Sequence, residues 1–158
     1  FSRVIVMGDS SGGGLALGLC EYFLTINNPQ PDELILMAPW TDVTLSNPEL
    51  LKYEKVDPRN HTKQTRAWGE FWSNGDTKNY KVSPIYGEMK GLKNVTIITG
   101  TYDVLYPDST RLVEKLSQAN VKHTFIIGER MNHVYPVYPI PEAKPVIQNI
   151  CSIILSES

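Results

Sequence analysis

Cysteine is scarce in this sequence, and long hydrophobic runs are missing from it. Two cysteines, Cys20 and Cys151, among 158 residues are too few for a disulfide-stabilised scaffold. Each lies among apolar residues at helical spacing, so we expect both thiols to be buried. No apolar run approaches the roughly 18 residues of a membrane-spanning helix, and the first residues show no signal-peptide pattern. We therefore expect no membrane span and a cytoplasmic location.

A strong charge of either sign is also lacking. The formal net charge is -2, with 20% charged and 41% hydrophobic residues. Nucleic acids and anionic membranes are bound by concentrated basic surfaces, so the composition gives no reason to expect either partner. The hydrophobic fraction is too high for a disordered chain. One globular domain that acts on a neutral small molecule fits these values best.

Four short apolar runs predict buried β-strands. They are 4–7, 34–37, 95–98 and 124–127. Their hydrophobicity is continuous instead of alternating, which is typical of a parallel sheet with helices on both faces. We therefore predict an α/β fold with a parallel sheet of about four strands.

Helical patterns separate or follow these runs. One helix is predicted after Gly13, with an apolar stripe formed by Leu15, Ala16, Leu19, Cys20 and Phe23. Another follows Pro107, with Asp108 or Ser109 expected as its cap and Asn120 at its end. A last helix carries Val146, Ile147, Ile150, Cys151 and Ile154 along one side, which we expect to close the remaining face of the sheet.

Residues 41–86 break this alternation of strands and helices. The segment contains several prolines and polar residues, with an amphipathic patch at Trp68, Phe71 and Trp72. We interpret it as an inserted cap over a binding cleft. A structural excursion without a role in binding fits the sequence equally well.

The motif with the clearest chemistry lies at Gly8–Gly12, where GDSSG matches G-x-S-x-G between a predicted strand and a predicted helix. Such a nucleophile elbow presents Ser10 above the sheet, and the amide of Ser11 can stabilise an oxyanion. Side chains at Gly8 or Gly12 are expected to collide with neighbouring backbone. A phosphate-binding loop is disfavoured, because the spacing G-x-G-x-x-G and the ending G-K-[ST] are both missing.

A serine nucleophile needs a histidine base, and the chain has three histidines. Sites on parallel sheets lie beyond the carboxyl ends of the strands. His133 follows the last predicted strand, whereas His123 precedes that strand and belongs to the opposite edge. His61 falls in the predicted cap. We therefore predict His133 as the general base.

The base in turn needs a carboxylate, and the same rule favours Asp103 at the end of the third strand. Asp108 is the alternative, but its position beside a proline at a helix start suits a cap. Asp42 and Asp9 are interpreted as turn residues. The order Ser10, Asp103, His133 is the order of triads in α/β-hydrolases. This chemistry needs neither a cofactor nor a metal ion, and we expect none.

At this point the chain resembles the hormone-sensitive-lipase-like branch of the α/β-hydrolases. The motif at 8–13 is close to that branch's G-D-S-A-G-G, with Ser11 in place of alanine. Its later landmarks are matched by Ser83-Pro84, Gly91-Leu92, Thr99-Gly100, Asp103-Val104-Leu105, Asp108 and His133. The resemblance implies hydrolysis of short- to medium-chain esters, with residues 41–86 forming part of the acyl or alcohol pocket.

The chain also departs from that branch, whose members carry about four strands and an H-G-G-G-type oxyanion loop before the elbow. Here the elbow begins at Gly8, and the first residue is Phe1. We therefore expect residues 1–158 to be the carboxyl-terminal part of one α/β-hydrolase domain, weak or inactive alone because one oxyanion donor is lacking. The strand at 4–7 would then be a bare edge, so we expect self-association or a need for the amino-terminal half.

Two other functions stay open at this point. A binding or receptor protein can use the same scaffold without catalysis, because a fold does not fix a function. A peptidase or thioesterase can use the same three residues on a different substrate. The complete serine, aspartate and histidine set favours an esterase over the non-catalytic alternative.

Overall fold

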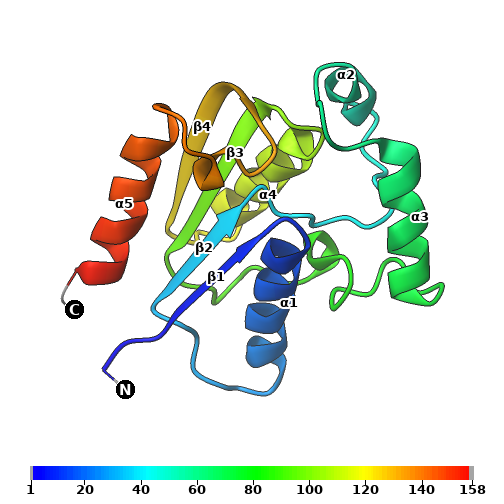
Figure 1. Ribbon diagram of the computed structural model, residues 1–158. Coiled ribbons are helices and arrows are strands. Elements are labelled where there is room, and N and C mark those ends of the chain that lie inside the picture. The colour runs from blue at the N-terminus through cyan, green and yellow to red at the C-terminus, as the bar shows by residue number, and fades with distance from the viewer. Residues whose placement is uncertain (1, 157–158) are drawn as a thin grey trace.

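All four predicted apolar runs form strands of one sheet. The computed structural model describes residues 2–156. Its strands are β1 (Ile5–Asp9), β2 (Glu33–Met37), β3 (Val95–Tyr102) and β4 (His123–Asn132). They lie in the order β1-β2-β3-β4, and each neighbouring pair is parallel. The predicted α/β class and the four-stranded parallel sheet are therefore confirmed (Figure 1).

Helices cover both faces of this sheet (Figure 1). The covering helices are α1 (Ser11–Thr25), α4 (Tyr106–Gln118) and α5 (Ala143–Leu155), whereas α2 (Leu50–Glu54) and α3 (Thr62–Ser73) belong to the 41–86 segment. In β2, Leu34 and Leu36 pack in one core with α1 and α4, while Ile35 and Met37 pack in another with α5. Residues that point to either face of the sheet are buried, which explains the continuous hydrophobicity of this strand.

The predicted apolar stripe of α1 is only partly correct. Ala16 and Cys20 are buried against the sheet, but Leu15 is 62% exposed and Leu19 38%. The buried side of α1 carries glycines, and a Cβ at Gly14 would overlap the carbonyl oxygen of Trp40. Close approach of the two backbones therefore selects the glycine side of α1 for the core.

The buried side of α5 also differs from the predicted stripe. Val146 and Ile150 pack in the core formed with β2, so the helix closes the second face as predicted, and Ala143 is buried at the start of the helix. Ile147, Ile154 and Cys151 point away and are exposed. The prediction of a buried thiol at Cys151 is wrong, since the apolar surface of α5 is wider than its contact with the sheet.

Residues 41–86 lie between β2 and β3 and add no strand to the sheet. They carry α2, α3 and a short 3₁₀ turn at Pro84–Tyr86. In Figure 1, α2 and α3 lie to one side of the sheet and not against its faces. A small core joins this segment to the end of β3, formed by Leu45, Leu50, Val104 and Leu105. The segment is therefore anchored beside the carboxyl ends of the strands.

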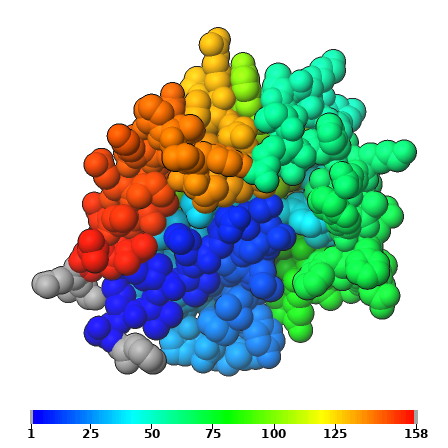
Figure 2. All heavy atoms as spheres, in the orientation of Figure 1, coloured from blue at the N-terminus to red at the C-terminus, as the bar shows by residue number. Residues whose placement is uncertain are grey.

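Strand β1 forms one edge of the sheet and pairs with β2 alone. Val4 and Met7 are each 49% exposed. The space-filling view shows β1 and α1 uncovered on the front of the molecule (Figure 2).

Within the described part of the chain, every helix is too short or too polar to traverse a lipid bilayer.

Candidate active site

Ser10 occupies a strained turn between β1 and α1. Its φ of 51° and ψ of -120° are uncommon for a residue with a side chain. Three backbone hydrogen bonds hold it there. The Ser10 amide donates to the Met37 carbonyl at 2.9 Å, and the Ser10 carbonyl accepts from Trp40 at 2.8 Å and Gly14 at 3.1 Å. The end of β2 therefore fixes the conformation in which the hydroxyl projects from the turn.

The glycines around Ser10 serve this turn unequally. A Cβ at Gly8 would overlap the carbonyl oxygen of Gly12, so glycine is required at position 8. A Cβ at Gly12 would meet nothing within 4 Å. The predicted collision at Gly12 is therefore wrong. The constrained positions in α1 are Gly13, which packs on Pro39, and Gly14.

His133 lies in the loop that follows β4, and its imidazole joins two other groups. Its Nε2 is 2.9 Å from the Ser10 hydroxyl oxygen. Its Nδ1 is 2.9 Å from Oδ2 of Asp103, which follows β3. The three side chains come from sequence positions up to 123 residues apart, and each follows the carboxyl end of its strand. The structure therefore brings together the serine, histidine and aspartate that the sequence singled out.

Burial and hydrogen bonding fix the orientation of this trio. Asp103 is fully buried and His133 is 6% exposed. The second carboxylate oxygen of Asp103 accepts from the Leu105 amide at 2.8 Å. A proton on His133 Nδ1 satisfies Asp103 and leaves Nε2 as an acceptor for the Ser10 hydroxyl. The arrangement can thus take a proton from Ser10 and stabilise the charge that the imidazole gains.

The other two histidines lie elsewhere. His123 is the first residue of β4, at the opposite end of the strand, where Nε2 is 3.3 Å from the Ser117 hydroxyl. His61 precedes α3 in the 41–86 segment and is exposed. Within residues 2–156, neither of these histidines is hydrogen-bonded to Ser10.

Asp108 is not the helix cap that its position predicted. It lies inside the first turn of α4, is fully buried, and accepts from the Asn47 side chain at 3.2 Å. Burial raises the pKa of Asp108 to about 6, opposed by the Asn47 hydrogen bond and by Arg111, while Asp42 adds to the rise. Within residues 2–156 Asp108 is not hydrogen-bonded to His133, so Asp103 is the aspartate of the trio.

Asp42 is more than a turn residue, since it is fully buried. Its carboxylate accepts from Thr44, Ser46 and Tyr86, and it lies 3.6 Å from Arg111. Burial opposes ionisation, but these hydrogen bonds outweigh it and lower the pKa of Asp42. The sequence showed an aspartate after a strand but no sign of these partners.

The amide of Ser11 begins α1, so it has no acceptor within the helix. The positive end of the helix dipole adds to its capacity to stabilise a negative oxygen beside Ser10.

Asp9 is the last residue of β1 and is exposed. Within residues 2–156, no three His, Cys, Asp or Glu side chains are grouped so as to hold a metal ion.

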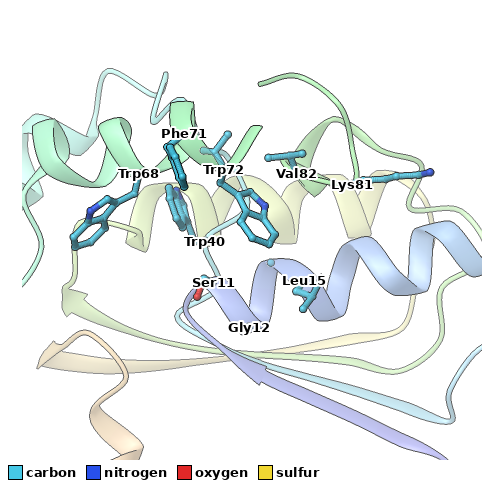
Figure 3. A pocket seen from close by; sticks show the side chains of 11 residues that line it. Ser11, Gly12, Leu15, Trp40, Trp68, Phe71, Trp72, Lys81 and Val82 are labelled. Atoms are coloured by element: carbon cyan, nitrogen blue, oxygen red, sulfur yellow. The ribbon is translucent and has the colours of Figure 1, made fainter. Parts of the chain in front are cut away.

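Two cavities lie beside the trio. One of about 110 Å³ borders Ser10 and is also lined by Asn60, Val104 and Leu105. The other, of about 430 Å³, lies between α1 and α3 and has an aromatic lining from Trp40, Trp68, Phe71 and Trp72 (Figure 3). Ser11, Trp40 and Trp68 border both. The amphipathic patch of the sequence therefore faces the larger cavity, which borders Ser11 and adjoins the smaller one at Ser10.

Sequence reasoning missed two residues at this site, Trp40 and Asp57. Trp40 follows β2, so the rule that selected Asp103 and His133 could have found it. Asp57 lies in the 41–86 segment but accepts the amide of Val104 at 2.9 Å, 47 residues away. No local signal predicts that contact.

A strained serine on a strand-to-helix turn, hydrogen-bonded to a histidine that is oriented by an aspartate, defines the class of α/β proteins with a nucleophile elbow. A family model described as the alpha/beta hydrolase fold matches residues 1–137. The chain belongs to this family.

Individual relatives agree with this assignment. An esterase from Acinetobacter venetianus is 30% identical over 157 residues, which are 97% of this chain and 52% of the esterase. A triacylglycerol lipase from Mycobacterium tuberculosis is 27% identical over 132 residues, 84% of this chain and 26% of the lipase. The chain thus spans about half the length of the esterase.

Solved structures give the same result. A hormone-sensitive lipase from a metagenome library matches with a TM-score of 0.92 and 31% identity, over 97% of this chain and 52% of that one. The hormone-sensitive-lipase homologue EstE7, also from a metagenome library, matches with a TM-score of 0.90 and 31% identity, over 95% and 53%. The resemblance to the hormone-sensitive-lipase branch is confirmed at the level of fold and family.

Proposed function

We propose that the protein is a serine hydrolase that cleaves carboxylic esters through an acyl-enzyme. The observation that carries this proposal is the 2.9 Å contact between His133 Nε2 and the Ser10 hydroxyl, continued on the other side of the ring by Asp103. The names of the esterase and lipase relatives support esters as the substrate class. Residues 1–158 act in this proposal as part of a single hydrolase domain.

In the first half of the reaction, His133 Nε2 takes the hydroxyl proton as the Ser10 oxygen attacks the ester carbonyl. Negative charge develops on the carbonyl oxygen, and the Ser11 amide donates to it. His133 then returns the proton to the departing alcohol, which leaves an acyl group on Ser10. Asp103 stabilises the imidazolium in both steps.

In the second half, a water molecule replaces the alcohol. His133 takes a proton from this water while the oxygen attacks the acyl carbon. Collapse of the intermediate returns the proton to Ser10 and releases the carboxylic acid. Reactants and products balance, since one water and one ester give one alcohol and one acid.

The cavities support short- to medium-chain substrates. About 110 Å³ beside Ser10 holds only a few atoms beyond the reacting carbonyl, whereas the adjoining aromatic cavity of about 430 Å³ lies within the range of ordinary ligand sites. We propose that residues 41–86 act as a cap whose helix α3 lines the acyl or alcohol pocket. Each substrate methylene that an apolar lining buries adds about 0.8 kcal/mol to the free energy of binding.

Labelling with a fluorophosphonate probe tests the nucleophile directly. We expect one adduct, on Ser10, and none after Ser10→Ala. Ser117→Ala is the matched control, because Ser117 also lies near a histidine nitrogen, at 3.3 Å, but on the opposite end of the sheet. A non-catalytic binding protein would give no adduct, and an adduct on any other residue would refute the assignment of Ser10.

A further inference from the structure

One buried carboxylate in the 41–86 segment contacts the loop that carries the triad aspartate. Asp57 follows α2 and is 5% exposed. Its Oδ2 accepts the amide of Val104 at 2.9 Å, and this hydrogen bond is itself buried. Val104 is the residue that follows Asp103. A side chain of the insertion therefore holds one end of the peptide group that joins Val104 to the acid.

The remaining acceptor positions of Asp57 are used as well. Its Oδ1 accepts from the amides of Arg59 at 2.8 Å and Asn60 at 3.0 Å. Its Oδ2 also accepts from the Asn60 side chain at 3.2 Å. The carboxylate is therefore fixed by its own turn before it reaches Val104, so the contact is rigid.

The acid loop depends on this contact, because three successive groups share the work of orienting Asp103. Leu105 donates its amide to the Asp103 carboxylate at 2.8 Å, and the amide of Tyr106 donates to the Asp103 carbonyl at 3.0 Å. The amide of Val104, which lies between Asp103 and Leu105 in the chain, donates to Asp57. Without that acceptor a buried donor is left unpaired, and the loop must turn to satisfy it.

We propose that Asp57 is a positioning residue for the triad, which couples the insertion to the orientation of Asp103 and, through it, to His133. The inference rests on the proposed function. Asp57 touches no reacting atom. It also shapes the substrate side of the site, since Asn60, which it holds, lines the small cavity beside Ser10.

The sharpest variant is Asp57→Asn, because it preserves size. All four polar hydrogens that meet Asp57 are donated by its neighbours, two to each oxygen, so an amide group must set its own NH₂ against two of these donors. The matched control is Asp42→Asn, which alters another buried aspartate of the insertion, one that accepts from Thr44, Ser46 and Tyr86 but not from residues 103–105.

Nitrogen-15 NMR of histidine-labelled protein reports the orientation without any turnover, at a pH where the imidazoles are neutral. We expect His133 to be the Nδ1–H tautomer in the unaltered protein and in Asp42→Asn, and a mixture of tautomers in Asp57→Asn. The His123 signals should stay unchanged as an internal reference. In steady-state assays kcat should fall about 10²-fold in Asp57→Asn with little change in KM, which is typical of a displaced catalytic group.

An unchanged His133 tautomer in folded Asp57→Asn would overturn the inference. If that variant does not fold, hydrogen exchange in the unaltered protein decides: we expect the Val104 amide to exchange as slowly as the core of β3, and exchange at the rate of exposed loops would refute the contact. Failure of the proposed hydrolase activity is distinguishable, because it would appear as missing fluorophosphonate labelling while the tautomer result stood.

Discussion

The candidate site has two walls that differ in the burial of their side chains. The strand-end wall consists of Asp103 and His133 at the carboxyl ends of the strands, and the helix wall consists of the aromatic residues of α3. On the strand ends, Asp103 is fully buried, His133 is 6% exposed, and hydrogen bonds hold both. On α3, Trp68 is 56% exposed and Phe71 89%. These aromatic groups line the larger cavity, which borders Ser11 (Figure 3).

The difference separates two tasks. Proton transfer needs groups held within a fraction of an ångström, which buried hydrogen bonds on a sheet provide. Binding of an acyl or alcohol chain needs apolar area, which exposed aromatic side chains supply without a fixed geometry. Changes to the strand-end wall should therefore lower kcat for every substrate, and changes to the helix wall should alter KM for some.

The largest effect is expected at the base. In the whole hydrolase domain, His133→Ala should lower kcat for p-nitrophenyl acetate by about 10⁴- to 10⁶-fold, because within residues 2–156 His133 is the only base hydrogen-bonded to the Ser10 hydroxyl. His123→Ala is the matched control and should stay within about threefold. Equal losses in both variants, measured on protein with an unchanged unfolding midpoint, would remove His133 from its assigned role.

The next effect distinguishes the two aspartates that the sequence offered as the acid. Asp103→Asn should lower kcat about 10⁴-fold, since an amide favours the wrong histidine tautomer. Asp108→Asn should keep nearly full activity, because Asp108 contacts Asn47 and not His133. A larger loss for Asp108→Asn than for Asp103→Asn in the same kinetic assay would reverse the assignment.

A smaller and substrate-dependent effect is expected on the helix wall. Trp68→Ala should raise KM for p-nitrophenyl hexanoate about tenfold, the equivalent of about 1.4 kcal/mol of lost contact, and leave KM for the acetate nearly unchanged. Tyr22→Ala serves as the control, because it removes a partly exposed aromatic side chain of α1 that lies outside the cavity lining. An equal rise for both esters would mean that the cavity holds the alcohol group.

Burial by itself does not make a carboxylate part of the site, as Glu21 shows. Glu21 of α1 is 2% exposed, and within residues 2–156 neither carboxylate oxygen has a hydrogen-bond partner. Burial raises the pKa of Glu21 to about 9 from its ordinary 4.5, with Lys115 opposing the rise and Glu88 adding to it. Folding therefore favours the protonated acid, whereas the two oxygens of Asp103 both accept hydrogen bonds.

This contrast predicts a pH dependence of stability. The pKa of Glu21 is higher in the folded chain than in the unfolded chain, so protonation of Glu21 favours the fold. This contribution to stability is fully present below the pKa of the unfolded chain, and it is lost as the pH rises toward about 9. From about pH 5 to about pH 7.5 the loss amounts to at most about 3 kcal/mol. In urea-unfolding measurements, Glu21→Gln should reduce the change of the unfolding free energy with pH over this range. Glu114→Gln, at an exposed position of α4, should not. An unchanged slope in Glu21→Gln would contradict the burial argument.

The smallest change concerns the sheet edge, which lies away from both walls. Met7 of β1 is 49% exposed on an edge strand, so we expect the protein to self-associate there. Met7→Lys should shift light-scattering profiles toward the monomer, whereas Val137→Lys, at a side chain that is 59% exposed outside the sheet, should not. A monomeric unaltered protein at high concentration would rule out this contact.

The sequence predicted the residues of the candidate site and determined the layout of the strands. Continuous apolar runs identified all four strands, and the motif at 8–12 between a strand and a helix identified Ser10. The positions of Asp103 and His133 after their strands followed from one rule, because parallel strands present their carboxyl ends at the same edge. Each of these signals is local or follows from chain order.

Only the tertiary structure decided which surfaces meet. It turned the glycine side of α1 toward the sheet, left Cys151 exposed, and buried Asp108 inside α4 against Asn47. It also joined Asp57 to Val104 across 47 residues. Periodicity reports that a face is apolar but not how closely another backbone approaches it, and a hydrogen bond between distant residues exists only once the chain has folded.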